Sequence, residues 1–174
     1  MSYSKQEWIN NSSVVNEERM NHIEEGIYQN DQAISRILSN SIMVANPTSV
    51  GATLGVAYEI VYLYLNDIIA QRGTDLVVEN GVIKCIKTGF VKVNASIMYY
   101  SGSTGNYVST VVAKNDDTWA QGSLPYVSEY TNPLAEAIIP VQANDILKLG
   151  AISSTADVSI QTWGVVTKLS VQYI

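Results

Sequence analysis

The sequence has little of the residue types on which catalysis, metal binding and cross-linking depend. Its 174 residues include one cysteine, Cys85, and one histidine, His22. A single cysteine excludes an internal disulfide and a zinc site built from several cysteines. A single histidine, far in sequence from every candidate nucleophile, does not support a Ser-His-Asp or Cys-His site. We therefore predict that the protein is not an enzyme, that it binds no metal or cofactor, and that Cys85 is a small core residue.

Long apolar runs and an excess of positive charge are also missing. No stretch reaches the roughly 18 apolar residues of a membrane-spanning helix, so no membrane insertion is expected. The first residues, MSYSKQEWINNSS, lack the apolar core of a secretory signal. The net charge of -6 argues against binding to nucleic acid. The aspartates lack the spacing of a calcium loop and are expected to be solvated.

What is present is a helical repeat in residues 16–40. One series of positions there is spaced alternately by three and four residues: Met20, Ile23, Ile27, Asn30, Ile34 and Ile37. This spacing is the a/d seam of a coiled coil, and isoleucine at both a and d favours three or more strands. Asn30 is a polar layer of the kind that fixes register and copy number. The seam predicts a homotrimer, although it covers fewer than three heptads, and a single helix lying on a globular body is the alternative.

Strand patterns replace the helical period after residue 40. Residues 41–56 contain Pro47 and Gly51 and are predicted to be a linker, with residues 42–44 as a candidate docking strand. Residues 57–174 form the predicted head domain. About eight strands joined by turns, with no second helix, predict a mainly β protein with an antiparallel sandwich or barrel.

Individual strands of the head can be assigned from alternation and turn signals. Asn80-Gly81 predicts a type I′ hairpin turn. Residues 58–69 are apolar on both faces and predict one fully covered strand, and residues 90–100 predict another long strand. Residues 165–174 predict a closing strand. Residues 115–133, rich in turn formers, predict a long irregular loop.

The N-terminal segment resembles that of structural proteins from tailed bacteriophages. The resemblance lies in Trp8, Ile9, Asn10 and Ser12, followed by the run NEERMNHIEEGI at residues 16–27. Proteins with this segment include head-fibre, neck and upper-baseplate proteins, where it tends to lie at the attachment end of a trimeric fibre. The resemblance implies location in a virion, residues 1–15 as the anchoring segment with Trp8 and Ile9 as its contacts, and capsid, neck or baseplate proteins as partners. Because the seam is short, the shaft is expected to be short.

The head resembles the TNF/C1q-like jelly rolls. Three segments carry the resemblance, namely TGFVKVNASI at 88–97, VQANDILKL at 141–149 and TKLSVQYI at 167–174. Asn144 stands where these folds usually have glycine. The resemblance implies a compact trimer, which agrees with the separate prediction from the helical seam.

Aromatic and polar residues in the predicted loops are the best candidates for ligand contact. The candidate glycan-contact residues are Tyr100, Asn106, Tyr107, Trp119, Tyr126 and Tyr130. Aromatic rings that stack and polar side chains that form hydrogen bonds suit the sugars of a cell envelope. The alternative is that these rings fill a subunit interface, where tyrosine is enriched.

These observations together predict a non-enzymatic, trimeric virion fibre protein whose head adheres to host-surface polysaccharide, with a capsid head fibre favoured over other sites in the virion. The alternatives are a baseplate or tail receptor-binding protein, or a small glycan depolymerase. A secreted signalling protein is disfavoured by the missing signal sequence.

Overall fold

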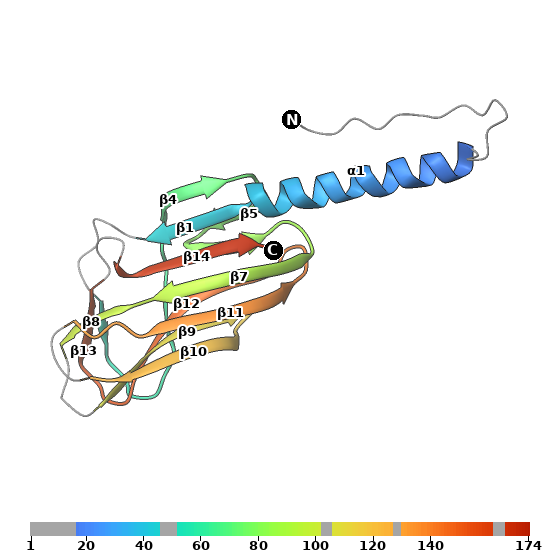
Figure 1. The fold of residues 1–174 in the computed structure, drawn as a ribbon. Helices are drawn as coiled ribbons and strands as arrows, with labels where there is room; N and C mark the ends of the chain where they lie inside the picture. The colour runs from blue at the N-terminus through green and yellow to red at the C-terminus, as the bar shows by residue number, and fades with distance from the viewer. Residues whose placement is uncertain (1–16, 46–51, 102–105, 127–129, 162–165) are drawn as a thin grey trace. The chain divides into compact units, whose positions relative to one another are not determined.

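The computed structural model describes residues 17–45, 52–101, 106–126, 130–161 and 166–174 (Figure 1). The chain divides into two compact units, Met1–Ser39 and Asn40–Ile174, and each is described by itself. The predicted virion anchor, Trp8 and Ile9, lies outside the described residues.

The first unit contains the helix α1 (Glu17–Ser39). Glu17 and Glu18 begin it, which suits the positive end of the helix dipole. The predicted helix is confirmed, and its association with copies of itself stays a prediction. Among the described residues, no helix is both long enough and apolar enough to cross a membrane.

The second unit is an antiparallel β-structure. Its described strands are β1 (Ser41–Ala45), β2 (Ala52–Leu54), β3 (Val61–Leu63), β4 (Asp67–Arg72), β5 (Leu76–Glu79), β6 (Val82–Cys85), β7 (Gly89–Ser96), β8 (Met98–Ser101), β9 (Tyr107–Lys114), β10 (Asp117–Pro125), β11 (Leu134–Val141), β12 (Ile146–Ser153), β13 (Val158–Gln161) and β14 (Lys168–Tyr173).

Two larger sheets enclose the core of this unit. One has the order β11-β7-β14-β1-β4, and the other has the order β10-β9-β12-β6-β5 with β3 also paired to β12. A smaller sheet has the order β2-β13-β8. Alternation places one face of each central strand in the core. In β14, for example, Leu169, Val171 and Tyr173 are buried, as the sequence pattern of the closing strand predicts.

The head begins at Asn40, not at residue 57, so the predicted linker is corrected. The candidate docking strand at residues 42–44 is confirmed, because Ser41–Ala45 form β1, which lies between β14 and β4 and buries Ile42 and Val44. Asn40 is itself buried. Its side-chain Oδ1 accepts a hydrogen bond from the Asp75 N–H at 3.1 Å, and its carbonyl accepts one from the Tyr173 N–H at 3.1 Å. One buried residue therefore joins the helix to the sandwich, and residues 46–51 of the predicted linker lie outside the description.

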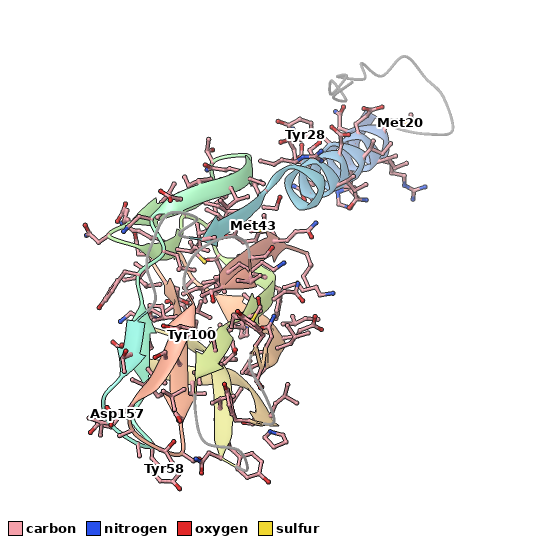
Figure 2. All side chains as sticks on the ribbon, turned by 90° about the vertical axis from the view of Figure 1, so that its left-hand side faces the viewer. Met20, Tyr28, Met43, Tyr58, Tyr100 and Asp157 are labelled. Atoms are coloured by element: carbon pink, nitrogen blue, oxygen red, sulfur yellow. The ribbon has the colours of Figure 1, made fainter. Side chains whose placement is uncertain are left out.

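The two ends of the sandwich can be located from this strand. Figure 2 shows Met43 of β1 near one end of the second unit and Tyr58 and Asp157 at the other, with Tyr100 between them. We call the end that carries Tyr58 and Asp157 the distal tip, because it lies away from Asn40, the first residue of the unit.

The prediction of one continuous strand at residues 58–69 is wrong. The segment contains two short strands in different sheets, because β3 pairs with β12 and β4 pairs with β1. Between them the Leu65 N–H donates to the Gly81 carbonyl at 3.0 Å, which draws the chain out of line with β3. An apolar run can therefore serve two sheets without being one strand.

The predictions for residues 90–100 and 115–133 also need correction. The first segment divides into β7 and β8, and the Met98 N–H at the division donates to Thr167 Oγ1 at 3.0 Å. The second contains β10, which forms a hairpin with β9. Its turn places Asn115 at φ 50 and Asp116 at φ 76, in the left-handed region that Asn and Asp tolerate. The type I′ prediction at Asn80-Gly81 is confirmed, with φ of 52 and 76.

Candidate functional site

The predicted seam of α1 is exposed on the single chain. Ile23, Ile27 and Ile34 are all exposed, and Ile34 keeps 55% of its surface accessible. Met20 is half-buried, Asn30 is exposed, and the side chain of Ile37 lies outside the description. Exposed isoleucines at coiled-coil spacing form an apolar stripe that a neighbouring helix would cover.

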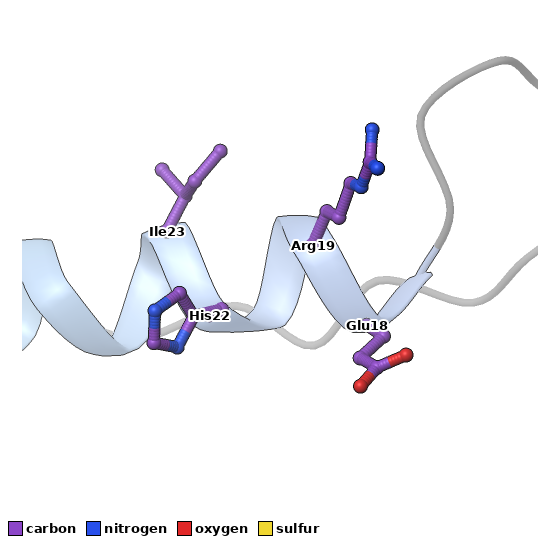
Figure 3. Close-up of a pocket in the computed structure, with 4 residues that line it drawn as sticks. All are labelled: Glu18, Arg19, His22 and Ile23. Atoms are coloured by element: carbon purple, nitrogen blue, oxygen red, sulfur yellow. The ribbon is translucent and has the colours of Figure 1, made fainter.

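A shallow hollow lies along the first turns of α1 and contains the only histidine. Its lining residues are Glu18, Arg19, His22 and Ile23 (Figure 3). Figure 3 shows Arg19 and Ile23 pointing to one side of the helix and Glu18 and His22 to the other. These four described side chains therefore diverge from one helix and do not converge on a point.

The five-stranded sheet carries a second exposed apolar surface, which we call the β11 face. It comprises Phe90, Leu134, Ile138 and Ile174, all exposed. Leu134 and Ile138 lie on the same side of β11, where Pro140 is paired with Phe90 of β7. The Ile174 N–H donates to the Phe90 carbonyl at 3.1 Å. The strand register thus places these four exposed apolar residues on the outer side of one sheet, where the exposed charged residues Lys92 and Glu136 lie among them. Exposed apolar residues gathered in this way and bordered by charged ones are typical of an interaction site.

The structure separates the predicted glycan-contact residues. Along the β9–β10 hairpin, Tyr107 is opposite Pro125, whereas Asp117 is opposite Lys114 at the turn. Tyr107 therefore lies near the distal tip, and Trp119 lies near the opposite end. Tyr126 is only 4% exposed and belongs to the core, so its ring is not available to a ligand. Asn106 is half-buried beside Tyr107.

Tyr100 and Tyr130 form a separate pair of exposed rings. They flank the isolated bridge between Tyr99 and Thr131, in which the Tyr99 N–H donates to the Thr131 carbonyl at 2.9 Å. Burial strongly raises the pKa of the Tyr99 phenol, whose hydroxyl donates to the Ser109 carbonyl at 2.6 Å. This buried tyrosine fixes the backbone beside the exposed pair.

Trp119 belongs to a polar network that holds the β9–β10 turn. The Lys114 ammonium lies 4.3 Å from the centre of the Trp119 ring and donates to the Pro140 carbonyl at 2.9 Å. Asp145 accepts hydrogen bonds from Asn115 Nδ2 at 2.7 Å and from the Gln142 N–H at 2.8 Å. Burial acts to raise the pKa of Asp145, but these hydrogen bonds and the Lys114 charge outweigh it and lower the pKa. These polar side chains therefore form contacts within the protein that hold the turn in place.

A second cation–aromatic contact lies on the other side of the same turn. The Lys148 ammonium donates to Asp116 Oδ1 at 2.6 Å and lies 5.0 Å from the centre of the Tyr62 ring. The hydrogen bond to Asp116 raises the pKa of Lys148, despite the opposing effect of burial. The β9–β10 turn is therefore held by contacts from both Lys114 and Lys148.

Cys85 is a buried core residue, as predicted from the sequence. Burial, together with the nearby negative charge of Asp145, raises the pKa of its thiol to about 11. The thiol is therefore protonated near neutral pH and is not a nucleophile. Within the described ranges, no three His, Cys, Asp or Glu side chains gather as metal ligands would.

Tyr58 is an exposed residue that sequence reasoning missed. The apolar run around it predicts a covered strand, whereas the structure leaves it 77% exposed with a left-handed φ of 63. No local signal distinguishes it from its neighbours, because its exposure depends on where β3 begins and on what lies beyond the end of β12.

Solved structures with the same fold were found, although no protein-family model and no curated protein matches the sequence. The crystal structure of murine APRIL at pH 8.0 superposes with a TM-score of 0.61 and 12% identity, covering 78% of this chain and 98% of that one. Eiger TNF from S. frugiperda gives 0.60 and 13%, covering 78% and 92%. The phage PRD1 vertex protein P5 gives 0.60 and 15%, covering 78% and 97%.

The second unit is a TNF-like jelly roll. At these identities the similarity establishes the fold alone. It confirms the fold predicted from the three sequence segments and explains one departure from their usual pattern. Asn144, which replaces the usual glycine of the turn, has φ 75, a left-handed conformation that glycine adopts freely and asparagine tolerates.

Proposed function

We propose that this chain is a non-enzymatic structural protein of a tailed-phage virion. It acts as a short homotrimeric fibre, attached through residues 1–15 and carrying a jelly-roll head that adheres to the host surface. Attachment to the capsid as a head fibre is favoured over the neck or baseplate. The observation that carries the proposal is the presence of one uncovered apolar surface in each of the two units.

The trimer is supported by surfaces of two different kinds. The stripe of α1 carries isoleucine at both a and d positions, the arrangement that favours three or more parallel helices. The β11 face exposes Phe90, Leu134 and Ile138 on a sheet whose fold resembles that of trimeric TNF-like proteins. Threefold association of identical chains would supply a partner for each surface, because every copy carries both.

Location in a virion is supported by two independent likenesses. The segment from Trp8 to Ile27 resembles the attachment segment of tailed-phage structural proteins. The head shares its fold with a protein named as the vertex protein of the phage PRD1. The first likeness concerns the first unit of the chain and the second concerns only the head.

Light scattering on the purified chain tests the trimer. The chain has a mass of 19.0 kDa, and we expect about three times that value in solution. A monomeric mass at micromolar concentration would contradict the proposal. A density map of the whole virion would then identify the part of the particle that carries the trimer. Density for the trimer away from the capsid would assign it to the neck or baseplate.

A further inference from the structure

Two exposed tyrosines flank the end of β12 at the distal tip. Tyr58 is 77% exposed and Tyr107 is 59% exposed. The Tyr58 N–H donates to the Ser153 carbonyl at 2.8 Å on one edge of β12, and the Ser154 N–H donates to the Tyr107 carbonyl at 2.9 Å on the other. With one strand between them, the two backbones lie roughly 10 Å apart, about two strand spacings. That separation suits a short oligosaccharide lying across both rings.

The backbone at each tyrosine is held by more than one constraint. Tyr58 has a φ of 63, a conformation that is uncommon for a bulky residue and that persists only where its surroundings impose it. The Tyr107 N–H donates to Ser154 Oγ at 2.9 Å, in addition to the bond that its carbonyl accepts. Asp157, also left-handed at φ 60, is fixed by its N–H bond to the Leu54 carbonyl at 2.7 Å. The rings therefore rise from a preorganised support.

The charge of the tip decides which ligands suit it. Its described segments, residues 52–61, 106–108, 123–126 and 153–160, contain no lysine or arginine, whereas Glu59 and Asp157 are exposed acids. Two lysines of the head lie toward the other end, Lys114 at the β9–β10 turn and Lys84 paired with Ile146 at the start of β12. An anionic polymer would meet no counter-charge at the tip and would be repelled by its acids.

We propose that the distal tip binds a neutral saccharide of the host surface. Tyr58 and Tyr107 stack on sugar rings, while the Asp157 carboxylate and the Ser154 hydroxyl form hydrogen bonds with sugar hydroxyls. The inference rests on the adhesive role proposed above and specifies its site and ligand class. Three tips on one trimer strengthen a weak single site when their spacing lets them engage together.

Substitution at Tyr58 separates binding from folding. Tyr58→Gly removes the ring and relieves the left-handed strain, so we expect an unchanged or higher melting temperature together with a loss of binding. Tyr107→Ala should also lose binding. Tyr64→Ala is the matched control, because Tyr64 is an exposed tyrosine of the same head that lies beside Gly81, away from the tip. All variants should keep the oligomeric state of the wild type, as measured by light scattering.

The binding measurement uses the full-length protein on immobilised polysaccharides and on host cells. Dextran and mannan serve as neutral probes, and poly(glycerol phosphate) teichoic acid serves as the anionic probe. We expect binding to a neutral polymer, and a weakening of about tenfold or more (about 1.4 kcal/mol) for each tip variant. Binding to host cells should survive protease treatment and be lost after periodate oxidation of the cell sugars.

Several outcomes would overturn the inference, and they differ from those that overturn the proposed function. Preference for teichoic acid, or protease-sensitive binding that resists periodate, would replace the neutral saccharide by another ligand class. Loss of binding by Trp119→Ala with the tip variants unchanged would move adhesion to another site. Adsorption that stays unchanged for virions carrying Tyr58→Gly, for those carrying Tyr107→Ala and for those carrying Trp119→Ala would remove the adhesive role while leaving the trimeric virion protein intact. Release of reducing ends would identify a depolymerase.

Discussion

Gly122 is a residue whose lack of a side chain sets how closely two strand edges approach. A Cβ built on Gly122 of β10 would overlap the carbonyl oxygen of Leu134 in β11. The obstacle is backbone, so relief requires the two strands to separate. We expect Gly122→Ala to lower the free energy of unfolding by about 1–3 kcal/mol or more, as overpacking does.

Urea unfolding of Gly122→Ala, followed by circular dichroism, measures this effect. Gly55→Ala is the matched control, since a Cβ there meets no atom within 4 Å. Equal stability of the two variants would show that β10 and β11 do not approach as described.

Asp145 should make the stability of the head depend on acid pH. Its pKa is lowered in the folded protein, so its contribution is fully present above the ordinary carboxyl pKa of about 4 and is lost as pH falls through the lower folded value. We expect Asp145→Asn to be less stable than the wild type at pH 7, with a difference that shrinks below pH 4. Melting temperatures from pH 7 to pH 2 test this, with the exposed Asp117→Asn as control. A difference that persists at pH 2 would contradict the assignment.

At the scale of the element, α1 combines an apolar stripe with one polar position. Asn30 is exposed on the single chain but becomes a buried layer if three helices pack along the seam. We expect Asn30→Ile to raise the melting temperature or to mix oligomeric states, because a buried polar layer lowers stability and fixes copy number.

Thermal melts and light scattering of Asn30→Ile provide the measurement. Gln32→Ile is the control, because it adds the same exposed side chain to α1 away from the seam. If both substitutions behave alike, Asn30 does not lie in a helix–helix contact.

The exposed β11 face leads to a prediction about subunit association for the head, as the seam does for α1. Ile138 is 60% exposed, and a charge at such a position in a monomer usually changes stability by no more than about 0.5 kcal/mol. In a trimer that buries this face, the added carboxylate loses its water, a cost that the Lys92 opposite position 138 offsets only in part. We therefore expect Ile138→Glu to lower the melting temperature and to shift the mass toward the monomer.

Ile86→Glu provides the comparison for Ile138→Glu, since Ile86 is an exposed isoleucine outside the β11 face. Sedimentation over a range of protein concentrations distinguishes weakened association from unfolding. A mass for Ile138→Glu that matches that of Ile86→Glu would place the subunit contact elsewhere.

At the scale of the whole molecule, attachment and association are assigned to different segments. Residues 1–15 are polar apart from a few residues that include Trp8, and large aromatics dominate the energetics of interfaces. We expect a chain lacking residues 1–15 to form the same oligomer as the full chain but to be missing from assembled virions. Mass measurement and immunodetection on purified particles test both parts, and normal incorporation of the truncated chain would place the anchor elsewhere.

Local patterns in the sequence were sufficient for several parts of this protein. The seam spacing predicted α1, Asn80-Gly81 predicted a hairpin turn, and alternation predicted which residues of the closing strand are buried. These features follow from interactions within a few residues of one another, or from the requirement that one face of an element leaves water. The jelly roll itself was predicted from its resemblance to known strands.

Only the tertiary structure decided which segments share a sheet and which aromatic rings share a surface. Ser41 pairs with Gln172, so a segment that reads as a linker is a sheet strand. The β9–β10 ladder separates Trp119 from Tyr107, although both were predicted to contact the same ligand, and the end of β12 brings Tyr58 and Tyr107 to the distal tip. Such pairings join residues far apart in the chain, and their stability comes from the core that the two sheets build together. For that reason no window of the sequence contains them.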